Sequence, residues 1–303
     1  VTARELEGAS AAYAAGFAAL GHGSEDMVIF ILEHSLDLIF AFWGALRAGI
    51  LPAIFPAMTP KLDPAYYQDR VRRLAEQAEA WGVVTSTALE PSLASLFAGT
   101  DRRLLSIETL HHQADPASPQ HNRQPGGDRL AFIQYSSGTT GLQKGVALSH
   151  TAILNNLEAI RLAVQAVPQD CIVTWLPLHH DMGLLTGVLL PVYLGIPAVI
   201  LSPLQWVRDP GILLRAVHEF RGTLTWMPNF AFHHSIRGVR QRDTEGLDLS
   251  SWRRLFNASE PVRYHSLQMF LDRFAPLGLA EQALASGYGL AEITGAVTLS
   301  PVG

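Results

Sequence analysis

A glycine- and hydroxyl-rich loop between two apolar runs is the densest chemical feature of the chain. Residues 136–145 read SSGTTGLQKG and combine three glycines, four hydroxyl side chains and Lys144. Glycines let backbone N–H groups turn inward, hydroxyls donate hydrogen bonds to phosphate oxygens, and a lysine supplies a compact positive charge. The loop therefore predicts phosphate binding. It is not a Walker A loop, because Gly145 rather than Ser or Thr follows Lys144 and because strands are predicted on both sides.

A second segment, residues 287–292, reads GYGLAE. Tyr288 stands between two glycines, and Glu292 follows four residues later. A ring exposed by flanking glycines can stack on a purine, and a carboxylate can hold Mg²⁺ that bridges phosphates. A turn with a buried tyrosine and a surface glutamate would explain residues 287–292 equally well. A glycine-rich hairpin without a ligand would likewise explain residues 136–145. Neither segment decides the function by itself.

A third segment, residues 175–183, reads WLPLHHDMG and follows another predicted strand. If the strand persists, the adjacent His179 and His180 point to opposite faces, which argues against a metal site shared by the two rings. One imidazole is then free to line a cleft.

Helical and strand patterns alternate almost from end to end, which favours an α/β fold with mainly parallel strands and helices on the sheet faces. A segment over 253–261 is predicted as a strand leading into a helix near Pro261, and 283–292 as a strand followed by a turn. The other predicted strands are 27–32, 51–55, 81–86, 103–107, 130–135, 145–149, 171–176, 198–201 and 223–227. The other predicted helices are 2–20, 35–49, 64–80, one near Pro91, one from about Thr151, 184–194, 209–220 and 229–240.

A polar stretch at residues 111–128 is rich in proline and glycine, as a loop between structural units is. It predicts two subdomains. Residues 1–120 would form a first α/β subdomain, and residues 121–303 a second one that contains the three segments described above.

Composition excludes several classes of protein. The 22 basic and 27 acidic side chains give a net charge of −5, which offers no basic field for nucleic acid or an anionic membrane. The single cysteine, Cys171, excludes a disulfide framework and a cysteine-based metal site, and fits a reducing cytoplasm. Glu5 and Glu7 stand where the apolar part of a signal peptide would begin, so we expect a cytoplasmic protein.

The longest uncharged stretch, residues 182–207, is the only candidate for a membrane span. Three prolines and Gly195 divide it into pieces too short to cross a bilayer as one helix. We therefore predict no membrane span, but a buried helix over 184–194, a turn and a buried strand.

Taken together, the three segments resemble, in order and approximate spacing, the motifs of the adenylate-forming superfamily. That superfamily contains acyl- and aryl-CoA synthetases, peptide-synthetase adenylation domains and fatty acyl-AMP ligases. Residues 256–261, FNASEP, resemble its adenine-pocket loop. HHDMG, PNFAF at 228–232 and the pair LDLSSWR and NASEPV make the fatty acyl-AMP ligase branch the best match. The resemblance covers nearly the whole chain and implies the layered αβαβα large domain of these enzymes, two stacked and mainly parallel sheets with helices on their faces, in incomplete form.

The resemblance implies ATP and Mg²⁺ as cofactors and assigns roles by position. His180 would lie near the reacting carboxylate, at the mouth of an acyl pocket to which residues 228–232 contribute. His180, Lys144 and Glu292 would be the catalytic residues, and Thr140 and Glu292 would bind Mg²⁺. The residues assigned to the phosphates are Ser137, Gly138, Thr139, Thr140, Gly141, Lys144 and Gly145. Those assigned to the adenine are Ala258, Ser259, Glu260, Gly287, Tyr288 and Gly289.

The implied reaction is ATP-dependent activation of a fatty or other hydrophobic acid to acyl-AMP, with release of pyrophosphate. The acyl group would pass to an acyl carrier protein or to CoA. Gln143 stands where the family usually has proline, Ala258 where it often has glycine, and Ala291 where threonine is frequent elsewhere in the superfamily. Counterparts of the C-terminal domain and its catalytic lysine are missing from the 303 residues, so we expect these residues alone to adenylate poorly.

Two other classes of protein were compared with this interpretation. A non-catalytic half-domain that binds acyl groups or a carrier protein would explain a charged fraction of 16%, since a partner would cover the exposed face. A P-loop kinase or hydrolase conflicts with the context of Lys144.

Overall fold

The computed structural model describes residues 1–22, 26–59, 62–112, 127–135 and 144–300. The chain forms two compact units, Val1–Ala152 and Ile153–Gly303. The predicted boundary between residues 120 and 121 lies outside the described residues, so the division into 1–120 and 121–303 stays a prediction.

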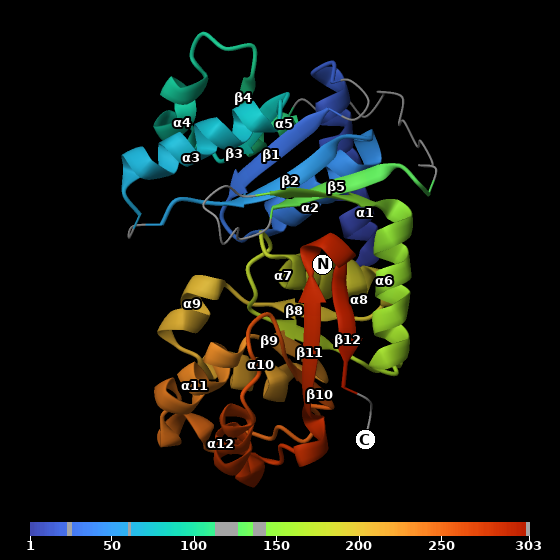
Figure 1. The fold of residues 1–303 in the computed structure, drawn as a ribbon, viewed down its shortest axis with the longest axis vertical. Helices are drawn as coiled ribbons and strands as arrows, with labels where there is room; N and C mark the ends of the chain where they lie inside the picture. The colour runs from blue at the N-terminus through green and yellow to red at the C-terminus, as the bar shows by residue number, and fades with distance from the viewer. Residues whose placement is uncertain (23–25, 60–61, 113–126, 136–143, 301–303) are drawn as a thin grey trace. The chain divides into compact units, whose positions relative to one another are not determined.

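The first unit is an α/β structure around a parallel sheet with the strand order β2-β1-β3-β4 (Figure 1). Two further strands, β5 (Leu130–Tyr135) and β6 (Gly145–Ser149), form an antiparallel pair on either side of the predicted phosphate loop. The strands of the parallel sheet are β1 (Met27–Leu32), β2 (Leu51–Pro56), β3 (Gly82–Thr85) and β4 (Arg103–Ser106). The helices are α1 (Ala3–Ala19), α2 (Leu36–Ala48), α3 (Pro64–Gln77), α4 (Glu90–Phe97) and α5 (Ile107–His112).

Local capping explains where several of these helices begin. Thr2 and Glu5 form a reciprocal capping box at the start of α1, and the Ser35 hydroxyl caps α2. The Asp63 carboxylate accepts a hydrogen bond of 2.8 Å from the Tyr66 N–H, with Pro64 in the first turn of α3. These neighbours in sequence satisfy N–H groups that a helix leaves without partners.

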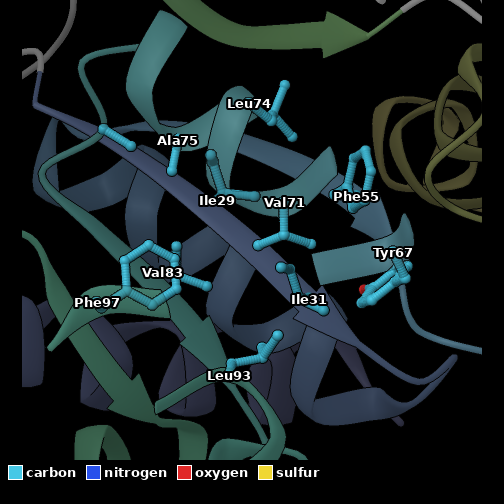
Figure 2. Packing of buried hydrophobic residues seen from close by; sticks show 11 residues of the cluster. Ile29, Ile31, Phe55, Tyr67, Val71, Leu74, Ala75, Val83, Leu93 and Phe97 are labelled. Atoms are coloured by element: carbon cyan, nitrogen blue, oxygen red, sulfur yellow. The ribbon is translucent and has the colours of Figure 1, made fainter. Parts of the chain in front are cut away.

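The core of the first unit follows from side-chain alternation along β1. Ile29 and Ile31 point to one face of the sheet, where α3 and α4 cover them, as Figure 2 shows. Phe30 points to the opposite face and meets Phe17 of α1 at a ring-centroid distance of 6.3 Å. The buried partners of Ile29 and Ile31 include Phe55, Tyr67, Val71, Leu74, Ala75, Val83, Leu93 and Phe97.

The second unit contains a six-stranded sheet with the order β12-β11-β10-β9-β7-β8. Five strands run parallel, and β12 pairs antiparallel with β11 at one edge. Helix α6 (His150–Ala163) begins in the first unit and continues into this one. The strands are β7 (Ile172–Thr174), β8 (Ala198–Ile200), β9 (Leu224–Met227), β10 (Arg254–Asn257), β11 (Leu284–Leu290) and β12 (Gly295–Leu299). The other α-helices are α7 (Asp181–Leu184), α8 (Leu190–Leu194), α9 (Pro203–Arg208), α10 (Gly211–Phe220), α11 (Asn229–Gly238) and α12 (Tyr264–Phe274), joined by the short helical turns η2 (Gln241–Thr244), η3 (Ala275–Leu277), η4 (Glu281–Ala283) and η5 (Ala291–Ile293).

The long uncharged stretch folds largely as predicted. Its helix begins earlier than expected, at Asp181, and changes to a π-helical turn, η1 (Leu185–Leu189), before α8. Pro191 has no N–H to donate to the carbonyl of Gly187, which accounts for the altered helical pattern. Helix α9, which the sequence patterns did not predict, follows strand β8. Within the described ranges, no helix combines the length and apolar character needed to cross a bilayer. The α/β fold class is confirmed.

Candidate functional site

The loops that follow β7, β9 and β10 lie at the same end of the second sheet, the end where these strands terminate. These strands are parallel neighbours, so their carboxyl ends meet there. WLPLHHDMG follows β7, PNFAF follows β9, and the ASEP part of FNASEP follows β10. Open parallel sheets bind ligands at this edge, where loops of adjacent strands converge.

A pocket in the second unit brings together five of the residues predicted to bind the nucleotide. They come from two segments, the loop after β10 and strand β11. The five residues are Ala258, Ser259, Gly287, Tyr288 and Gly289. The remaining lining residues are Ile160, Asp181, Met182, Leu185, Thr186, Trp226, Gly295, Ala296 and Leu299.

The β11–β12 ribbon forms one wall of this pocket. Here the structure differs from the predicted strand followed by a turn, because β11 continues through GYG to Leu290 and pairs with β12. A side chain at Gly289 would place its Cβ 2.2 Å from the Gly295 carbonyl oxygen, so only glycine fits that close approach. Tyr288 keeps 55% of its surface exposed and presents a large aromatic face beside these glycines.

The loop after β10 forms a second part of the wall and has an unusual backbone. Ser259 has φ of +69°, a left-handed conformation that is uncommon for residues other than glycine. Its hydroxyl lies 3.5 Å from the Met182 sulfur. The Glu260 carboxylate accepts a 2.5 Å hydrogen bond from the Phe230 N–H at the start of α11, and Glu260 does not line the pocket. Its side chain therefore caps a helix, while the predicted role concerned its backbone.

His180 occupies a different setting from the one considered in the sequence analysis. Strand β7 ends at Thr174, so the premise of a persisting strand is wrong, and His180 is the N-cap of α7. Its Nδ1 lies 2.7 Å from Asp181 Oδ1, and Asp181 Oδ1 also accepts a 2.7 Å hydrogen bond from the Met182 N–H. With a proton on Nδ1 the ring donates to Asp181, and without one Nδ1 accepts from the Met182 N–H at 3.3 Å.

Asp181 is the acidic group of the pocket wall, with only 19% of its side chain exposed. Burial by itself would raise the pKa of Asp181. Hydrogen bonds from His180 and the Met182 N–H, with the charge of His180, outweigh burial and hold this pKa below its ordinary value. Asp181 therefore stays ionised at neutral pH.

The remaining predicted residues either do not line this pocket or fall outside the described residues. Ser137, Gly138, Thr139, Thr140 and Gly141 fall outside the described residues. Lys144 and Gly145 are exposed and belong to the first unit, and a Cβ at Gly145 would lie 2.9 Å from Ile133 Cγ2. Glu292 is exposed in η5 and does not line the pocket.

Sequence reasoning missed Asp181 as a member of the pocket, although it adjoins the predicted His180. It also missed Asn156, which hydrogen-bonds the β11–β12 ribbon from 140 residues away in sequence. Asp181 belongs to the HHDMG segment, which could have pointed to it, whereas no motif marks Asn156. Within residues 1–22, 26–59, 62–112, 127–135 and 144–300, no group of three His, Cys, Asp or Glu side chains could hold a metal ion.

Comparisons with known proteins agree with this arrangement. The family model of AMP-binding enzymes matches residues 1–303. The chain is 32% identical over 275 residues to the medium-chain-fatty-acid–[acyl-carrier-protein] ligase JamA of Moorena producens, which covers 89% of this chain and 46% of that protein. It is 31% identical over 286 residues to a 4-hydroxyphenylalkanoate adenylyltransferase of Mycobacterium marinum. That match covers 90% of this chain and 45% of the relative.

A solved structure of a fatty acyl-adenylate ligase from L. pneumophila, in complex with acyl adenylate and pyrophosphate, superposes with a TM-score of 0.86. The two chains are 31% identical, and the match covers 99% of this chain and 52% of that one. The chain thus spans about half the length of the curated relatives that it matches.

Proposed function

The chain belongs to the family of AMP-binding enzymes, and we propose that the protein containing it activates a hydrophobic carboxylic acid by adenylation. ATP and the acid would be converted to acyl-AMP and pyrophosphate. The family assignment confirms the resemblance drawn from the motifs, while the activity, substrate and partners are inferred for this protein.

One observation supports the proposal most directly: the pocket gathers Tyr288 and its two flanking glycines beside Ala258 and Ser259. An exposed aromatic face can stack on adenine, and residues without side chains allow backbone groups to approach a ligand. The pocket lies at the carboxyl edge of a parallel sheet, where such folds bind ligands. The arrangement suits a purine nucleotide.

We assign the phosphates to the loop before β6. Its glycines would let N–H groups face the phosphate oxygens, and Lys144 would add a positive charge. Lys144 is exposed and therefore accessible to a ligand. The proposed phosphate-binding residues are Ser137, Gly138, Thr139, Thr140, Gly141, Lys144 and Gly145.

Mg²⁺ fits the donors that the chain offers. This ion is usually held by one or two carboxylates together with substrate phosphates, rather than by a cage of protein ligands. The exposed Glu292 supplies one such carboxylate, and the Thr140 hydroxyl is the second proposed ligand. When bound, Mg²⁺ would neutralise phosphate charge and favour departure of pyrophosphate.

His180 and Asp181 form the unit that we assign to the acid substrate. We assign the tautomer in which Nδ1 carries a proton and donates to the Asp181 carboxylate, so that Nε2 would face the substrate. A protonated ring could donate from Nε2 to the substrate carboxylate and hold it near the α-phosphate. The residues of PNFAF, which follow β9 at the same sheet edge, are proposed to contribute to the acyl pocket.

The proposed reaction is a displacement at phosphorus. A carboxylate oxygen of the acid forms a bond to the α-phosphorus, the bond from that phosphorus to the bridging oxygen of the β-phosphate breaks, and pyrophosphate leaves with that electron pair. The protein contributes chiefly positioning and electrostatic stabilisation, since no covalent bond to the enzyme is required.

The relatives guide the choice of acid and acceptor. JamA is named for medium-chain fatty acids and an acyl carrier protein, and the Mycobacterium marinum relative for 4-hydroxyphenylalkanoates. We therefore propose a fatty or arylalkanoic acid, with a carrier-protein pantetheine as acceptor and CoA as the alternative. We also propose a cytoplasmic location, where ATP is supplied and a free thiol such as Cys171 stays reduced.

Acid-dependent exchange of pyrophosphate into ATP tests this proposal. We would compare the 303-residue chain with the longest reading frame that contains it, using a panel of fatty and arylalkanoic acids. Exchange with a particular acid would support adenylation and identify the substrate. Absence of exchange in both proteins, together with acyl or carrier-protein binding, would instead favour the non-catalytic half-domain.

A matched pair of tyrosine variants tests the pocket. Tyr288→Ala removes the proposed stacking partner, and we expect AMP affinity to fall about tenfold or more, since stacking a base on an aromatic ring contributes ~1–3 kcal/mol. Tyr264→Ala is the control, because Tyr264 is 77% exposed on α12 and does not line the pocket. Equal AMP affinity in the two variants would reject the assignment of adenine to Tyr288.

A further inference from the structure

The turn that joins η5 to β12 has a backbone that its residues disfavour. Thr294 has φ of +65° and is 6% exposed, and Gly295 follows with φ of +124°. A β-branched residue in the left-handed region is a conformational outlier, which costs about 1–3 kcal/mol and persists only where the surroundings hold it. Something in the second unit must therefore keep this turn in place.

Asn156 of α6 makes the contacts that do so. Its Nδ2 donates to the Ala296 carbonyl at 2.8 Å and lies 3.5 Å from the Ile293 carbonyl. Its Oδ1 accepts from the Ala296 N–H at 3.3 Å. One side-chain amide thus satisfies both backbone groups of Ala296, as a neighbouring strand would do for β12, which is the edge strand of its sheet.

The turn is also packed from the inside. A Cβ on Gly295 would lie 2.4 Å from Leu185 Cδ1 and 3.3 Å from Asn156 Oδ1. Gly295 is therefore enclosed between the π-helical turn and α6, and no other residue would leave the turn where it is. Asn156 and Leu185 together determine the position of the peptide that follows Thr294.

This turn connects two parts of the proposed nucleotide site. Glu292, the proposed Mg²⁺ ligand, lies two residues before Thr294 in the chain. Gly295 and Ala296 line the pocket with Tyr288, and Ala296 pairs with Gly289 in the ribbon. A displacement of the turn would move the Glu292 carboxylate and the pocket wall together.

We propose that Asn156 is a positioning residue, which holds the Thr294–Gly295 turn by pairing with Ala296 and so places Glu292 and the β11–β12 ribbon for Mg²⁺ and nucleotide. The inference rests on the proposed function, which it deepens. Asn156 does not itself line the pocket, so it acts through the turn rather than on the ligand.

The neighbouring asparagine supplies a matched control. Asn155 is exposed on the same helix, so Asn155→Ala and Asn156→Ala change the same side chain at adjacent helical positions. We would make both in the longest reading frame, together with Asn156→Asp. The aspartate keeps the shape and the acceptor, but it loses the N–H that donates to Ala296.

We expect Asn156→Ala and Asn156→Asp, but not Asn155→Ala, to raise the Mg²⁺ concentration for half-maximal pyrophosphate exchange by ~10-fold, the lower end for loss of a group that orients a metal ligand. Excess Mg²⁺ should restore part of the activity. Two measurements do not depend on activity: AMP affinity by calorimetry, which should fall in both Asn156 variants, and hydrogen exchange of the Ala296 amide, which should become faster in Asn156→Ala because its acceptor is lost.

The outcomes separate this inference from the proposed function. If the unchanged protein is active and the Asn155 and Asn156 variants show the same Mg²⁺ dependence and AMP affinity, the inference is overturned alone. A loss in the Asn156 variants that follows their melting temperature and does not respond to Mg²⁺ also overturns it. If the unchanged protein neither binds AMP nor exchanges pyrophosphate with any acid, the proposed function fails and the inference fails with it.

Discussion

The two units of the chain use the same α/β plan, but they treat the faces and edges of their sheets differently. In the first unit, β1 buries Ile29 and Ile31 against α3 and α4 (Figure 2) and Phe30 against Phe17 of α1. In the second, the carboxyl edge carries an open pocket, with left-handed Ser259 in its wall and left-handed Thr294 in the adjoining turn. The first unit shows apolar burial used for stability, while the second shows backbone kept in unfavourable conformations beside a binding surface.

The units also differ in what connects their elements. Both units have packed apolar side chains, but in the second an ion pair of the buried Asp170 also links three segments. Asp170, 1% exposed, accepts from Arg253 at 2.7 Å, from the Thr223 hydroxyl at 2.7 Å and from the Val167 N–H at 2.8 Å. Arg253 in turn donates to the Val164 carbonyl at the end of α6. The second unit thus adds a polar network to an aromatic core of its own, in which Phe232 and Phe274 contact Phe270.

The largest expected effect is on the apolar core. Phe30→Ala should lower the free energy of unfolding by about 4 kcal/mol, because it removes a fully buried ring and leaves a cavity. Hydrogen exchange followed by mass spectrometry should show the loss in peptides from β1 and β3, with peptides from β9 and β10 affected less. An equal loss of protection in both sets of peptides would mean that the two units unfold together. The contrast drawn between their stabilities would then be wrong.

The buried ion pair should come next. Asp170→Asn should destabilise the second unit by about 3 kcal/mol, because the Arg253 charge and the Val167 N–H lose a charged acceptor. Urea denaturation measures the change, and Asp69→Asn is the control, since Asp69 pairs with Arg72 and Arg73 on the surface of α3. If Asp170→Asn lowered the free energy of unfolding by less than Asp69→Asn, the Asp170 network would not stabilise the second unit as proposed.

Acid should weaken the first unit through His34. Burial lowers the pKa of His34 to about 4, and no hydrogen-bond partner for its buried Nε2 is found in the part of the chain that the structure describes. The unfolded chain therefore binds a proton near pH 6.5 that the folded chain accepts only near pH 4. Stability from this source is fully present above pH 6.5 and is lost as the pH falls toward 4, by about 2 kcal/mol at pH 5.

Comparing unfolding at pH 7 and pH 5 measures this effect. His34→Gln should remove that part of the pH dependence, and His22→Gln should leave it unchanged. If His34→Gln and the unchanged protein lose the same stability between these two pH values, then His34 is already charged in the folded state and the prediction is wrong.

The smallest expected effect is on AMP binding at the pocket of the second unit. Gly289→Ala should weaken AMP binding about tenfold, because its Cβ would meet the Gly295 carbonyl at 2.2 Å and overpacking of this kind costs ~1–3 kcal/mol. Gly8→Ala is the control, since Gly8 lies in α1 with open space around it and should gain about 0.5–1 kcal/mol of stability. Calorimetry gives the affinity. Unchanged AMP affinity in Gly289→Ala would show that the β11–β12 ribbon can move to accept a Cβ without loss of binding. The close approach at Gly289 would then not be required for the nucleotide site.

Local features were predictable because they depend on neighbours in the chain. The helix predicted over 64–80 begins at Pro64 after the Asp63 cap, and the helix predicted from about Thr151 is α6, which buries Ile153, Leu157 and Ile160. The strands flanking the phosphate loop were predicted within their observed bounds. The motifs also indicated the family, because their order and spacing are properties of the sequence itself.

The candidate site could be predicted from the sequence only in part. Tyr288 and Ser259 were expected in one nucleotide site from the resemblance, and the structure places both on one pocket. The setting of His180 was misjudged, because the end of β7 depends on its pairing with β8, whose last pair is Thr174 with Ile200. Helix and strand patterns do not specify such endpoints.

The sequence by itself determined the alternation of most helices and strands, the start of α3 and the family, since each depends on the chemistry of residues close together in the chain. Only the tertiary structure decided which strands are neighbours, that Arg253 pairs with Asp170, and that Asn156 supports Ala296. These contacts join segments that are 83 and 140 residues apart. Their energy is gained only after the chain has folded, so no local pattern encodes them.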